Sequence, residues 1–309
     1  MTTAAPLSTE SRFLGDLIAH GHFLPTGEPG LYGRGMVFED VRARLDALVT
    51  RIHAADRPET PRFPPLIPRR TLERAGYLNS FPHLCGVVFS FEGDAPAALK
   101  LAEQAKNGGD WTGLLSATGL ALVPAACYPS YPAIAARGPL PPEGVTLDLG
   151  GCYVFRHEPS GDPARLQMFH QRELVRIGAP DQVAAWRETW MNRARKIFEM
   201  AGLEAALAPA SDPFFGRAGK LLASSQREQG LKFEALVSIA SEQPTAAASF
   251  NLHQEHFGSA FGIRRHDGSV AHSSCVGFGL ERITLALFRA HGMDPGKWPQ
   301  SVRRNLWPE

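Results

Sequence analysis

The sequence of 309 residues predicts an α+β fold, in which helices flank an antiparallel β-sheet. Between Leu114 and Ile177, short apolar runs alternate with glycine and proline turns, which is typical of antiparallel strands. Apolar side chains then recur every three or four residues over 181–202, which predicts one long helix with an aromatic face against the sheet. Two more apolar runs, over 231–240 and 244–253, predict further strands.

The first half of the chain is expected to begin its core with an amphipathic helix over 37–52, where apolar side chains recur every three or four residues. The next segment, 58–70, holds five prolines in thirteen residues. A linker is one interpretation, but its apolar side chains favour an extended strand. A second helix is predicted to begin after Asp94, a typical N-cap, with Pro96 in its first turn, and to end at Gly108.

Composition excludes several classes of protein. The chain has 32 lysine and arginine residues and 31 aspartate and glutamate residues, so its net charge is 32 − 31 = +1. No general attraction to nucleic acid or to an anionic membrane is therefore expected. Four scattered cysteines form no disulfide framework, and no apolar run approaches the roughly 18 residues of a membrane helix. The N-terminus also lacks the pattern of an export signal, which predicts a cytoplasmic protein.

A first candidate site follows the apolar run that ends at Phe155. Arg156 and Glu158 lie two apart, so on a strand both would point to one face. An isolated pair of this kind is most often a surface ion pair. Here a turn-rich loop follows, and Arg165 and Phe169 return beyond it. An arginine can bind phosphate, a carboxylate can accept a purine amino hydrogen and an aromatic ring can stack on a base, which together indicate a nucleotide site.

A second candidate site is the sequence GFGLER in the segment 273–292, which is predicted to begin as a strand, to turn at Gly277 and Gly279 and to continue as a helix. Gly-x-Gly before a helix is a weak signal, and a simple packing turn is the alternative. Arg282, however, falls in the first turn of the predicted helix, where free N–H groups favour anions such as triphosphate oxygens.

The two candidate sites, the Arg156–Glu158 segment followed later by GFGLER, resemble the second and third signature motifs of class II aminoacyl-tRNA synthetases. The segment 62–82 is similar to the first motif of the seryl-tRNA synthetase branch, and 122–159 follows that branch's approach to the second motif. The resemblance covers residues 36–291 and implies a class II synthetase-like antiparallel sheet with flanking helices. It also implies a homodimer formed through the helix and strand of the first motif.

The resemblance further implies that the core binds ATP with Mg²⁺ and forms an aminoacyl-adenylate. Arg156 and Arg282 are the expected catalytic residues, on the α-phosphate and γ-phosphate respectively. Glu158 and Phe169 are expected on the adenine, and Glu234 in the metal or nucleotide shell. The expected ATP-binding residues are Arg156, Glu158, Arg165, Leu166, Phe169, Glu234, Ser249 and Arg282.

One departure from the bacterial seryl pattern indicates a metal. Those enzymes have Thr-x-Glu where this chain has Ala125-Ala126-Cys127. Cys127 and Cys275 are expected on strands that border the pocket, with Glu173 on the returning strand of the second motif. Two thiolates, one carboxylate and an open position make a tetrahedral zinc site of the catalytic type, and small buried cysteines are the alternative. The pattern is similar to zinc-dependent archaeal seryl-tRNA synthetases, in which Zn²⁺ binds the substrate amine.

Other residues near this site refine the prediction. His253 and His256 are a possible metal-binding pair on a helix, although a polar strand-to-loop segment is favoured. Small side chains at Ala125 and Ala248 predict a pocket for glycine or alanine. The expected substrate-binding residues are Cys127, Glu173, Ala125 and Ala248, and the expected ligands of one Zn²⁺ per chain are Cys127, Glu173 and Cys275.

A second departure concerns the acceptor. Residues 1–35 form only a short N-terminal extension before the core domain, 36–309, and they lack the long helical hairpin that binds tRNA in seryl-tRNA synthetases. The chain therefore looks like the amino acid:[carrier protein] ligases, which activate a small amino acid with ATP and transfer it to a phosphopantetheine thiol. No tRNA partner is expected.

The insert 211–232 fits that family and is interpreted as a docking surface for an acidic carrier protein. Its basic residues Arg217, Lys220 and Arg227 lie beside aromatic and aliphatic side chains, and an ordinary solvated helix is the alternative. Three other functions stay open. They are a tRNA-charging core that needs a partner, a paralogue that only binds its ligands, and a zinc hydrolase.

Overall fold

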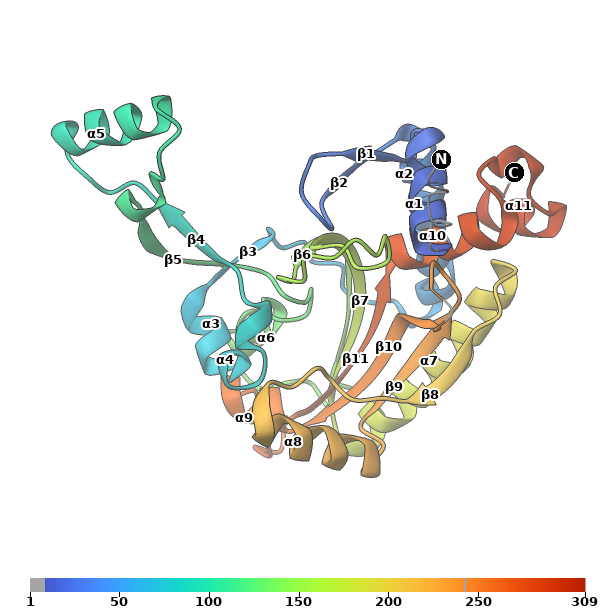
Figure 1. Cartoon of the computed structure of the whole chain (residues 1–309). Helices are drawn as coiled ribbons and strands as arrows, with labels where there is room; N and C mark the ends of the chain where they lie inside the picture. Colours follow the sequence, from blue (N-terminus) through green and yellow to red (C-terminus); the bar gives the residue numbers. More distant parts are fainter. Residues whose placement is uncertain (1–8, 242, 309) are drawn as a thin grey trace.

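The computed structural model describes residues 9–241 and 243–308. Its centre is a six-stranded, fully antiparallel sheet, which confirms the predicted α+β class (Figure 1). In spatial order its strands are β6 (Val145–Phe155), β7 (Met168–Gly178), β11 (His272–Gly279), β10 (Thr245–Gln254), β9 (Lys232–Val237) and β8 (Ala206–Pro209). Strands far apart in the sequence are therefore neighbours.

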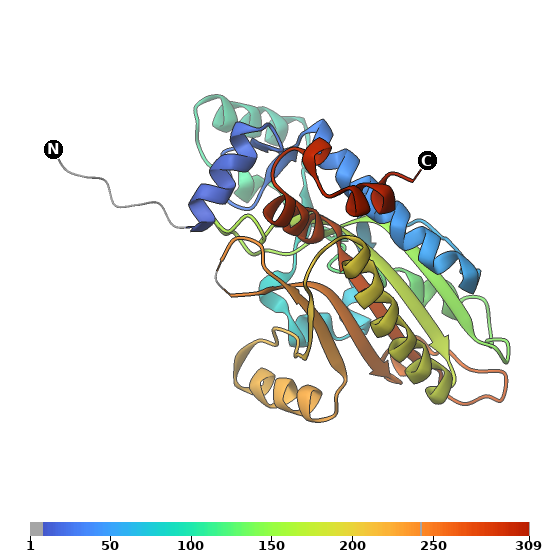
Figure 2. The same cartoon turned by 90° about the vertical axis from the view of Figure 1, so that its right-hand side faces the viewer.

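Three helices support one side of this sheet. They are α7 (Pro180–Met200), α10 (Leu280–His291) and α2 (Met36–His53). Helix α7 lies along the sheet and contacts β7, β10 and β11 (Figure 2). Its Trp190 is fully buried, with its ring 6.3 Å from that of Phe278 on β11. The predicted long helix with an aromatic face against the sheet is thus confirmed.

The remaining helices are shorter than α2 and α7. They are α1 (Thr9–Ala19), α3 (Arg69–Arg74), α4 (Tyr77–Ser80), α5 (Ala95–Lys106), α6 (Ser130–Ala135), α8 (Gly216–Glu228), α9 (His256–Phe261) and α11 (Gln300–Leu306). Helix α5 has the predicted cap, because the Asp94 side chain accepts a hydrogen bond of 3.0 Å from the N–H of Ala97. No described helix is both long and apolar enough to cross a lipid bilayer.

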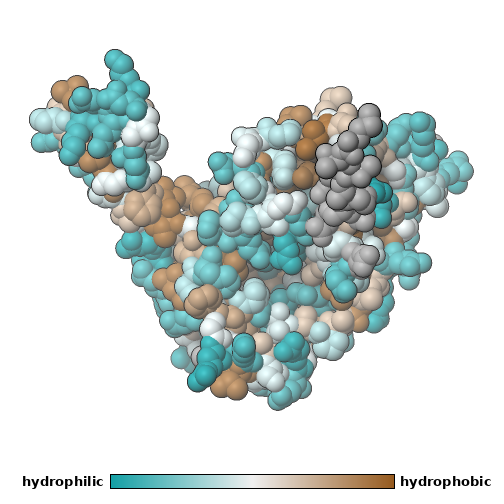
Figure 3. Space-filling model, viewed as in Figure 1, coloured by the Kyte–Doolittle hydropathy of each residue, from teal (hydrophilic) through white to brown (hydrophobic). Residues whose placement is uncertain are grey.

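An arm projects from the body of the molecule (Figures 1 and 3). It is built on a second sheet, in which β5 (Ser116–Leu122) pairs with β3 (Leu66–Pro68) and β4 (Val87–Ser90), and it carries α5. The strands of the middle segment are antiparallel as predicted, but they are divided between two sheets, since β5 belongs to this arm. The strand expected over 58–70 is also much shorter, because prolines cannot donate to a ladder.

The N-terminal segment packs on the core. A hairpin of β1 (Phe23–Pro25) and β2 (Tyr32–Arg34) places Phe23 5.3 Å from Phe38 of α2, ring to ring. His22 likewise lies 4.3 Å from Phe288 of α10. Of the extension predicted over 1–35, residues 1–8 lie outside the described residues, and the rest is part of the packed structure.

A buried charge cluster ties α2 to the sheet. Arg172 of β7 donates to Asp148 of β6 and, at 2.7 Å, to Asp46 of α2. His53 of α2 lies 3.1 Å from the same Asp148 carboxylate. Burial alone raises the pKa of Asp148, but the hydrogen bond from His53 and the charge of Arg172 outweigh it and hold that pKa below its ordinary value.

Replacing the buried carboxylate, Asp148→Asn, should lower the free energy of unfolding by about 3 kcal/mol at pH 7, because it leaves a buried guanidinium short of a partner. The folded-state pKa is depressed, so this stabilisation is present above the unfolded pKa and is lost as pH falls through the folded value. Urea titrations should therefore give an equal difference between wild type and variant from pH 7 to pH 5, and a smaller one below about pH 4.

The matched control is Glu73→Gln, which removes an exposed ion pair to Arg69 and should cost less than about 1 kcal/mol. A difference for Asp148→Asn that already narrows between pH 7 and pH 5.5 would show that the pH dependence does not come from the Asp148 carboxyl group.

Candidate active site

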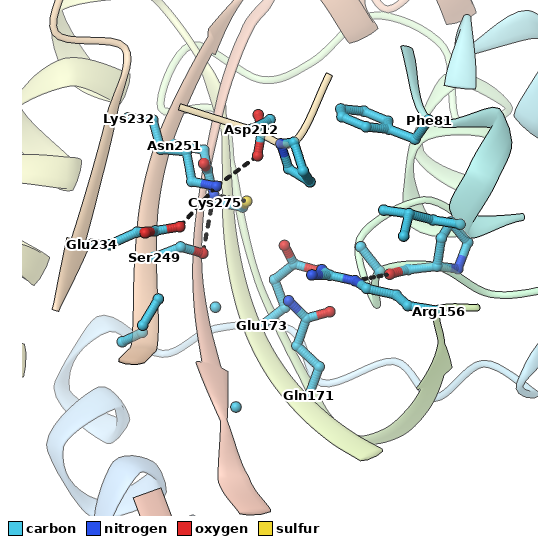
Figure 4. Close-up of a pocket in the computed structure, with 18 of the residues that line it drawn as sticks. Phe81, Arg156, Gln171, Glu173, Asp212, Lys232, Glu234, Ser249, Asn251 and Cys275 are labelled. Atoms are coloured by element: carbon cyan, nitrogen blue, oxygen red, sulfur yellow. Dashed lines mark hydrogen bonds and ion pairs between the residues drawn. The ribbon is translucent and has the colours of Figure 1, made fainter. Parts of the chain in front are cut away.

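The open face of the main sheet forms the floor of a cavity of about 660 Å³ (Figure 4). Strands β7, β9, β10 and β11 supply the floor, and the opposite wall comes from the α3–α4 region and the turn after β5. Both groups of residues predicted from the sequence, the nucleotide-binding group and the metal-binding group, contribute to its lining.

Strand register aligns four positions across this floor. Glu234 of β9 lies opposite Ser249 of β10, Ser249 opposite Gly277 of β11, and Gly277 opposite Glu173 of β7. A Cβ at Gly277 would come within 2.8 Å of the Gln171 amide and 3.3 Å of the Ser249 hydroxyl. Gly277 therefore keeps the floor open between two carboxylates, and the prediction that it forms a turn is wrong because β11 continues to Gly279.

A second row lies two residues along the same face. Lys232 of β9 is opposite Asn251 of β10, which is opposite Cys275 of β11. The Asn251 amide donates to the Ser249 hydroxyl and to the Cys275 sulfur, each at 3.3 Å. Asn251 was not predicted, since a lone asparagine in an apolar strand carries no motif.

Cys127, Glu173 and Cys275 come together at one end of the floor, as predicted. Their ligand atoms all lie within 4.8 Å of one another and all three residues are buried. Glu173 and Cys275 lie on strands β7 and β11. Cys127 does not lie on a strand as expected but in the turn between β5 and α6, where its N–H donates to the Glu173 carboxylate at 2.6 Å. The preceding Pro124 has no N–H to extend the β5 ladder.

The electrostatics of these three residues favour a cation. Burial raises the pKa of Glu173 and of Cys127, and the hydrogen bond that the Cys275 thiol donates to Cys127, together with burial, raises the pKa of Cys275 well above its ordinary value. Three anionic ligands in so small a buried volume need an added positive charge to ionise together. Two sulfurs and one carboxylate oxygen suit a borderline-soft divalent metal ion.

The nucleotide group lines the same cavity, and its Arg156 lies close enough to Glu173 for the arginine charge to act on that carboxyl group. The guanidinium of Arg156 stands over the Phe169 ring at 5.7 Å, and Arg165 lies 3.5 Å from the Glu158 carboxylate. Contrary to expectation, Arg156 and Glu158 are not within a strand, because β6 ends at Phe155 and the N–H of Glu158 turns back to the Arg156 carbonyl at 2.8 Å. All four side chains still line the cavity.

Arg282 lies in the first turn of α10, as predicted, and faces the cavity. It donates to the carbonyls of Ala164 at 2.8 Å and Ala246 at 3.0 Å, so it joins the loop after β6 to β10. Burial lowers its pKa to about 10, which leaves it charged at neutral pH. Ala125, Ala248, Glu234 and Ser249 also line the cavity, whereas Leu166 packs in the hydrophobic core.

The neighbouring Glu281 was not predicted from the sequence. Its fully buried carboxylate accepts from the backbone N–H and the ring of His170, both at 2.8 Å, and pairs with Arg34 at 3.1 Å. His170 directly follows Phe169 in the chain, so Glu281 fixes the start of α10 against the strand that carries Phe169. This anchor positions Arg282 relative to the nucleotide group.

A strap over residues 212–215 crosses one side of the cavity before α8 begins. Phe214 stacks on Phe81 at 5.2 Å, and the N–H of Phe215 donates to the Ser80 carbonyl at 2.9 Å. These contacts connect the strap to the wall formed by α4 and the turn that follows it.

Asp212 anchors the strap to the floor (Figure 4). Its carboxylate lies 2.6 Å from the Lys232 ammonium, which also pairs with Glu234 at 3.0 Å, and it accepts from Gln226 of α8 at 2.8 Å. Despite burial, the two carboxylates raise the pKa of Lys232. Neither Asp212 nor Lys232 was predicted, because their pairing depends on a loop that returns to the sheet.

The insert predicted over 211–232 contains α8. Its basic residues Arg217, Lys220 and Arg227 are exposed and do not line the cavity. Exposed apolar side chains lie beside them, with Phe215 60%, Leu221 73% and Leu222 49% exposed. A helix with both kinds of side chain in solvent has the composition of a contact surface.

Two curated relatives from Bradyrhizobium diazoefficiens are similar over most of their length. Amino acid--[acyl-carrier-protein] ligase 1 is 47% identical over 289 residues, which is 93% of this chain and 88% of the relative. Amino acid--[acyl-carrier-protein] ligase 2 is 46% identical over 93% of this chain and 86% of the relative. The type-2 serine--tRNA ligase of Methanopyrus kandleri is 27% identical over 79% of this chain, but the match spans only half of that relative.

Solved structures show the same fold. The seryl-tRNA synthetase of M. kandleri, solved with an A. aeolicus tRNA, superposes with a TM-score of 0.82 at 22% identity over 99% of this chain and 62% of that chain. Prolyl-tRNA synthetase of Giardia lamblia, solved with prolyl-adenylate, gives 0.67 at 12% identity over 90% of this chain and 52% of that one. The class II synthetase-like fold is therefore confirmed. No protein-family model matches the chain.

Proposed function

Because the chain belongs to the family of amino acid--[acyl-carrier-protein] ligases, we propose that it activates glycine or alanine with ATP and transfers it to the phosphopantetheine thiol of a carrier protein. The observation that carries this proposal is the row Glu173–Gly277–Ser249–Glu234. Glu173 at one end of this row belongs to the residues suited to a metal-bound amine, and Ser249 and Glu234 at the other end belong to those suited to a nucleotide. Only Gly277, which has no side chain, separates the two groups. A small amino acid fits between them.

In the first step the amino-acid carboxylate attacks the α-phosphate of ATP, an aminoacyl-adenylate forms and pyrophosphate leaves. Negative charge grows on the phosphoryl oxygens, so the work of the protein is positioning and charge stabilisation. Arg156 neutralises the α-phosphate and Arg282 the γ-phosphate, while Glu158 and Phe169 hold the adenine. Glu234 and Ser249 complete the nucleotide shell, in which Mg²⁺ accompanies the phosphates.

The residues Cys127, Glu173 and Cys275 fit zinc, by their donor set, their mutual distances and their burial. Zinc bound there would act as a Lewis acid toward the substrate amine. The protein's own contribution is to keep the three ligands ready in one place. The Cys127 N–H holds the Glu173 carboxylate, and the β11 backbone holds Cys275 beside it.

In the second step a thiol attacks the adenylate carbonyl carbon, a thioester forms, AMP leaves and the thiol proton is released. The thiol must arrive on the arm of a docked carrier protein. We assign docking to α8, since Arg217, Lys220 and Arg227 offer cations for an acidic surface and Leu221 offers an apolar anchor.

The size of the pocket sets the choice of amino acid. Ala125 and Ala248 line the cavity with small side chains, and the Lys232–Asp212 pair lies on the same floor, with Asn251 between Lys232 and Cys275. A side chain larger than a methyl or hydroxymethyl group would meet this charged pair.

We further propose that the protein is a homodimer, formed through α2 and the segment that follows it. We also propose that it acts in the cytoplasm.

A tRNA-charging core is the second candidate, favoured by the similarity to type-2 serine--tRNA ligases. One experiment separates the two functions. Amino-acid-dependent exchange of pyrophosphate into ATP, measured with each small amino acid, should be fastest with glycine or alanine and absent with leucine and phenylalanine. The same enzyme should then load a phosphopantetheinylated carrier protein and leave tRNA uncharged. Efficient tRNA charging would reverse the assignment.

The metal assignment predicts about one zinc per purified chain. Cys127→Ala should lose this zinc and amino-acid activation together, because one of only three protein ligands is gone. Metal content by mass spectrometry and pyrophosphate exchange measure the two effects. Cys85→Ala is the matched control, since Cys85 is outside the metal-binding group. This variant should keep both its zinc and its amino-acid activation. Full zinc occupancy in Cys127→Ala would exclude the assignment.

Arg156→Ala should slow adenylate formation by roughly 100-fold or more, as for loss of a preorganised donor to a developing negative charge. Single-turnover kinetics at saturating ATP isolate this step. Arg137→Ala, which removes an exposed arginine paired with Glu59, should leave the rate unchanged. A near-normal rate for Arg156→Ala would refute the role given to this residue.

Reversing two charges on α8, Arg217→Glu with Lys220→Glu, should weaken transfer to the carrier protein and leave adenylate formation intact, because α8 lies outside the nucleotide group. The change should appear mainly in the association rate and in its salt dependence. Arg289→Glu with Lys297→Glu makes the same change in charge at other exposed positions and serves as control. Unchanged transfer in the α8 variant would remove α8 from the interface.

A further inference from the structure

His253 lies beside the metal-binding group without belonging to it. Its Nε2 is 3.4 Å from the Cys275 sulfur, while its Nδ1 is 3.1 Å from the Ser273 hydroxyl. The three residues whose ligand atoms gather within 4.8 Å of one another do not include it. His253 and His256 are a possible metal-binding pair by sequence, but His256 instead contacts the Ala75 carbonyl at 3.1 Å.

We propose that His253 is a positioning residue for Cys275: its Nε2–H donates to the sulfur and directs it toward Cys127 and Glu173. This inference rests on the proposed metal site. A metal-bound thiolate carries no proton, so the imidazole must be the donor in this contact. Nδ1 is then the acceptor, and the Ser273 hydroxyl donates to it. Ser273 and Cys275 lie two apart on β11 and so share the face that His253 meets.

Packing holds the imidazole in this direction. Its ring meets the Phe257 ring edge to face at 4.9 Å and lies 6.4 Å from that of Tyr131. The Asn251 amide donates to the same sulfur at 3.3 Å, so two N–H groups from β10 approach Cys275. Groups that hydrogen-bond to a metal ligand in this way fix its orientation and raise metal affinity.

The test is the zinc affinity of the full-length protein, measured by competition with a chromophoric chelator. His253→Phe keeps a ring against Phe257 but has no N–H, and we expect zinc to bind about 10- to 100-fold more weakly. His253→Gln returns a donor near the Nε2 position and should restore most of the affinity. His256→Phe, a few residues along, is the control and should bind zinc as the wild type does.

Cobalt substitution gives a second readout that does not depend on activity. His253→Phe should retain a tetrahedral cobalt spectrum but shift the sulfur-to-cobalt charge-transfer band, because a hydrogen bond to sulfur is lost. Loss of a ligand from that spectrum would make His253 a ligand and overturn the proposal. Ser273→Ala leaves the ring in place and should weaken zinc binding by a smaller factor, which keeps the test available if the Phe variant does not fold.

The outcomes separate this inference from the proposed function. A wild-type protein that binds no zinc overturns both the metal assignment and the role of His253. Equal zinc affinity of wild type, His253→Phe and Ser273→Ala overturns only the role of His253.

Discussion

The candidate active site depends on one constraint, the antiparallel register of β9, β10, β11 and β7. Because side chains two apart on a strand share a face, this register alone brings Glu234, Ser249 and Glu173 into one line with Gly277 between them. A slip of one residue in any strand would turn its contribution toward α7 and break the line. The cavity is thus a property of the sheet, and the surrounding loops complete it.

Buried charges reinforce that register at points where strands meet helices. Glu281 holds α10 to β7, and Arg172 with Asp148 holds α2 to β6 and β7. Each carboxylate has at least two donors, which offsets the cost of removing its charge from water. The sheet is therefore fastened from the side opposite the cavity, and the floor is left free for groups that bind ligands.

Much of this was predictable from periodicity and spacing. The helices α2, α5, α7 and α10, the strands β7 and β10 and the gathering of Cys127, Glu173 and Cys275 follow from local patterns or from the order of motifs. The residues that were missed share another property. Lys232, Asp212, Asn251 and Glu281 acquire their partners only through tertiary contacts between distant segments, which no local pattern encodes. The register likewise places Gly277 within strand β11, where its motif indicated a turn.

The pairing of Lys232 also links the surface of the molecule to its cavity. Asp212 accepts from Gln226 of α8 and from Lys232 of β9, and Lys232 in turn holds Glu234. Separating these buried partners would leave a charge without compensation, so the network resists stretching. A partner that displaced α8 would act on Asp212 and, through it, on the position of Lys232. If α8 is the proposed docking surface, this network would connect a docked partner to Glu234 on the floor of the cavity.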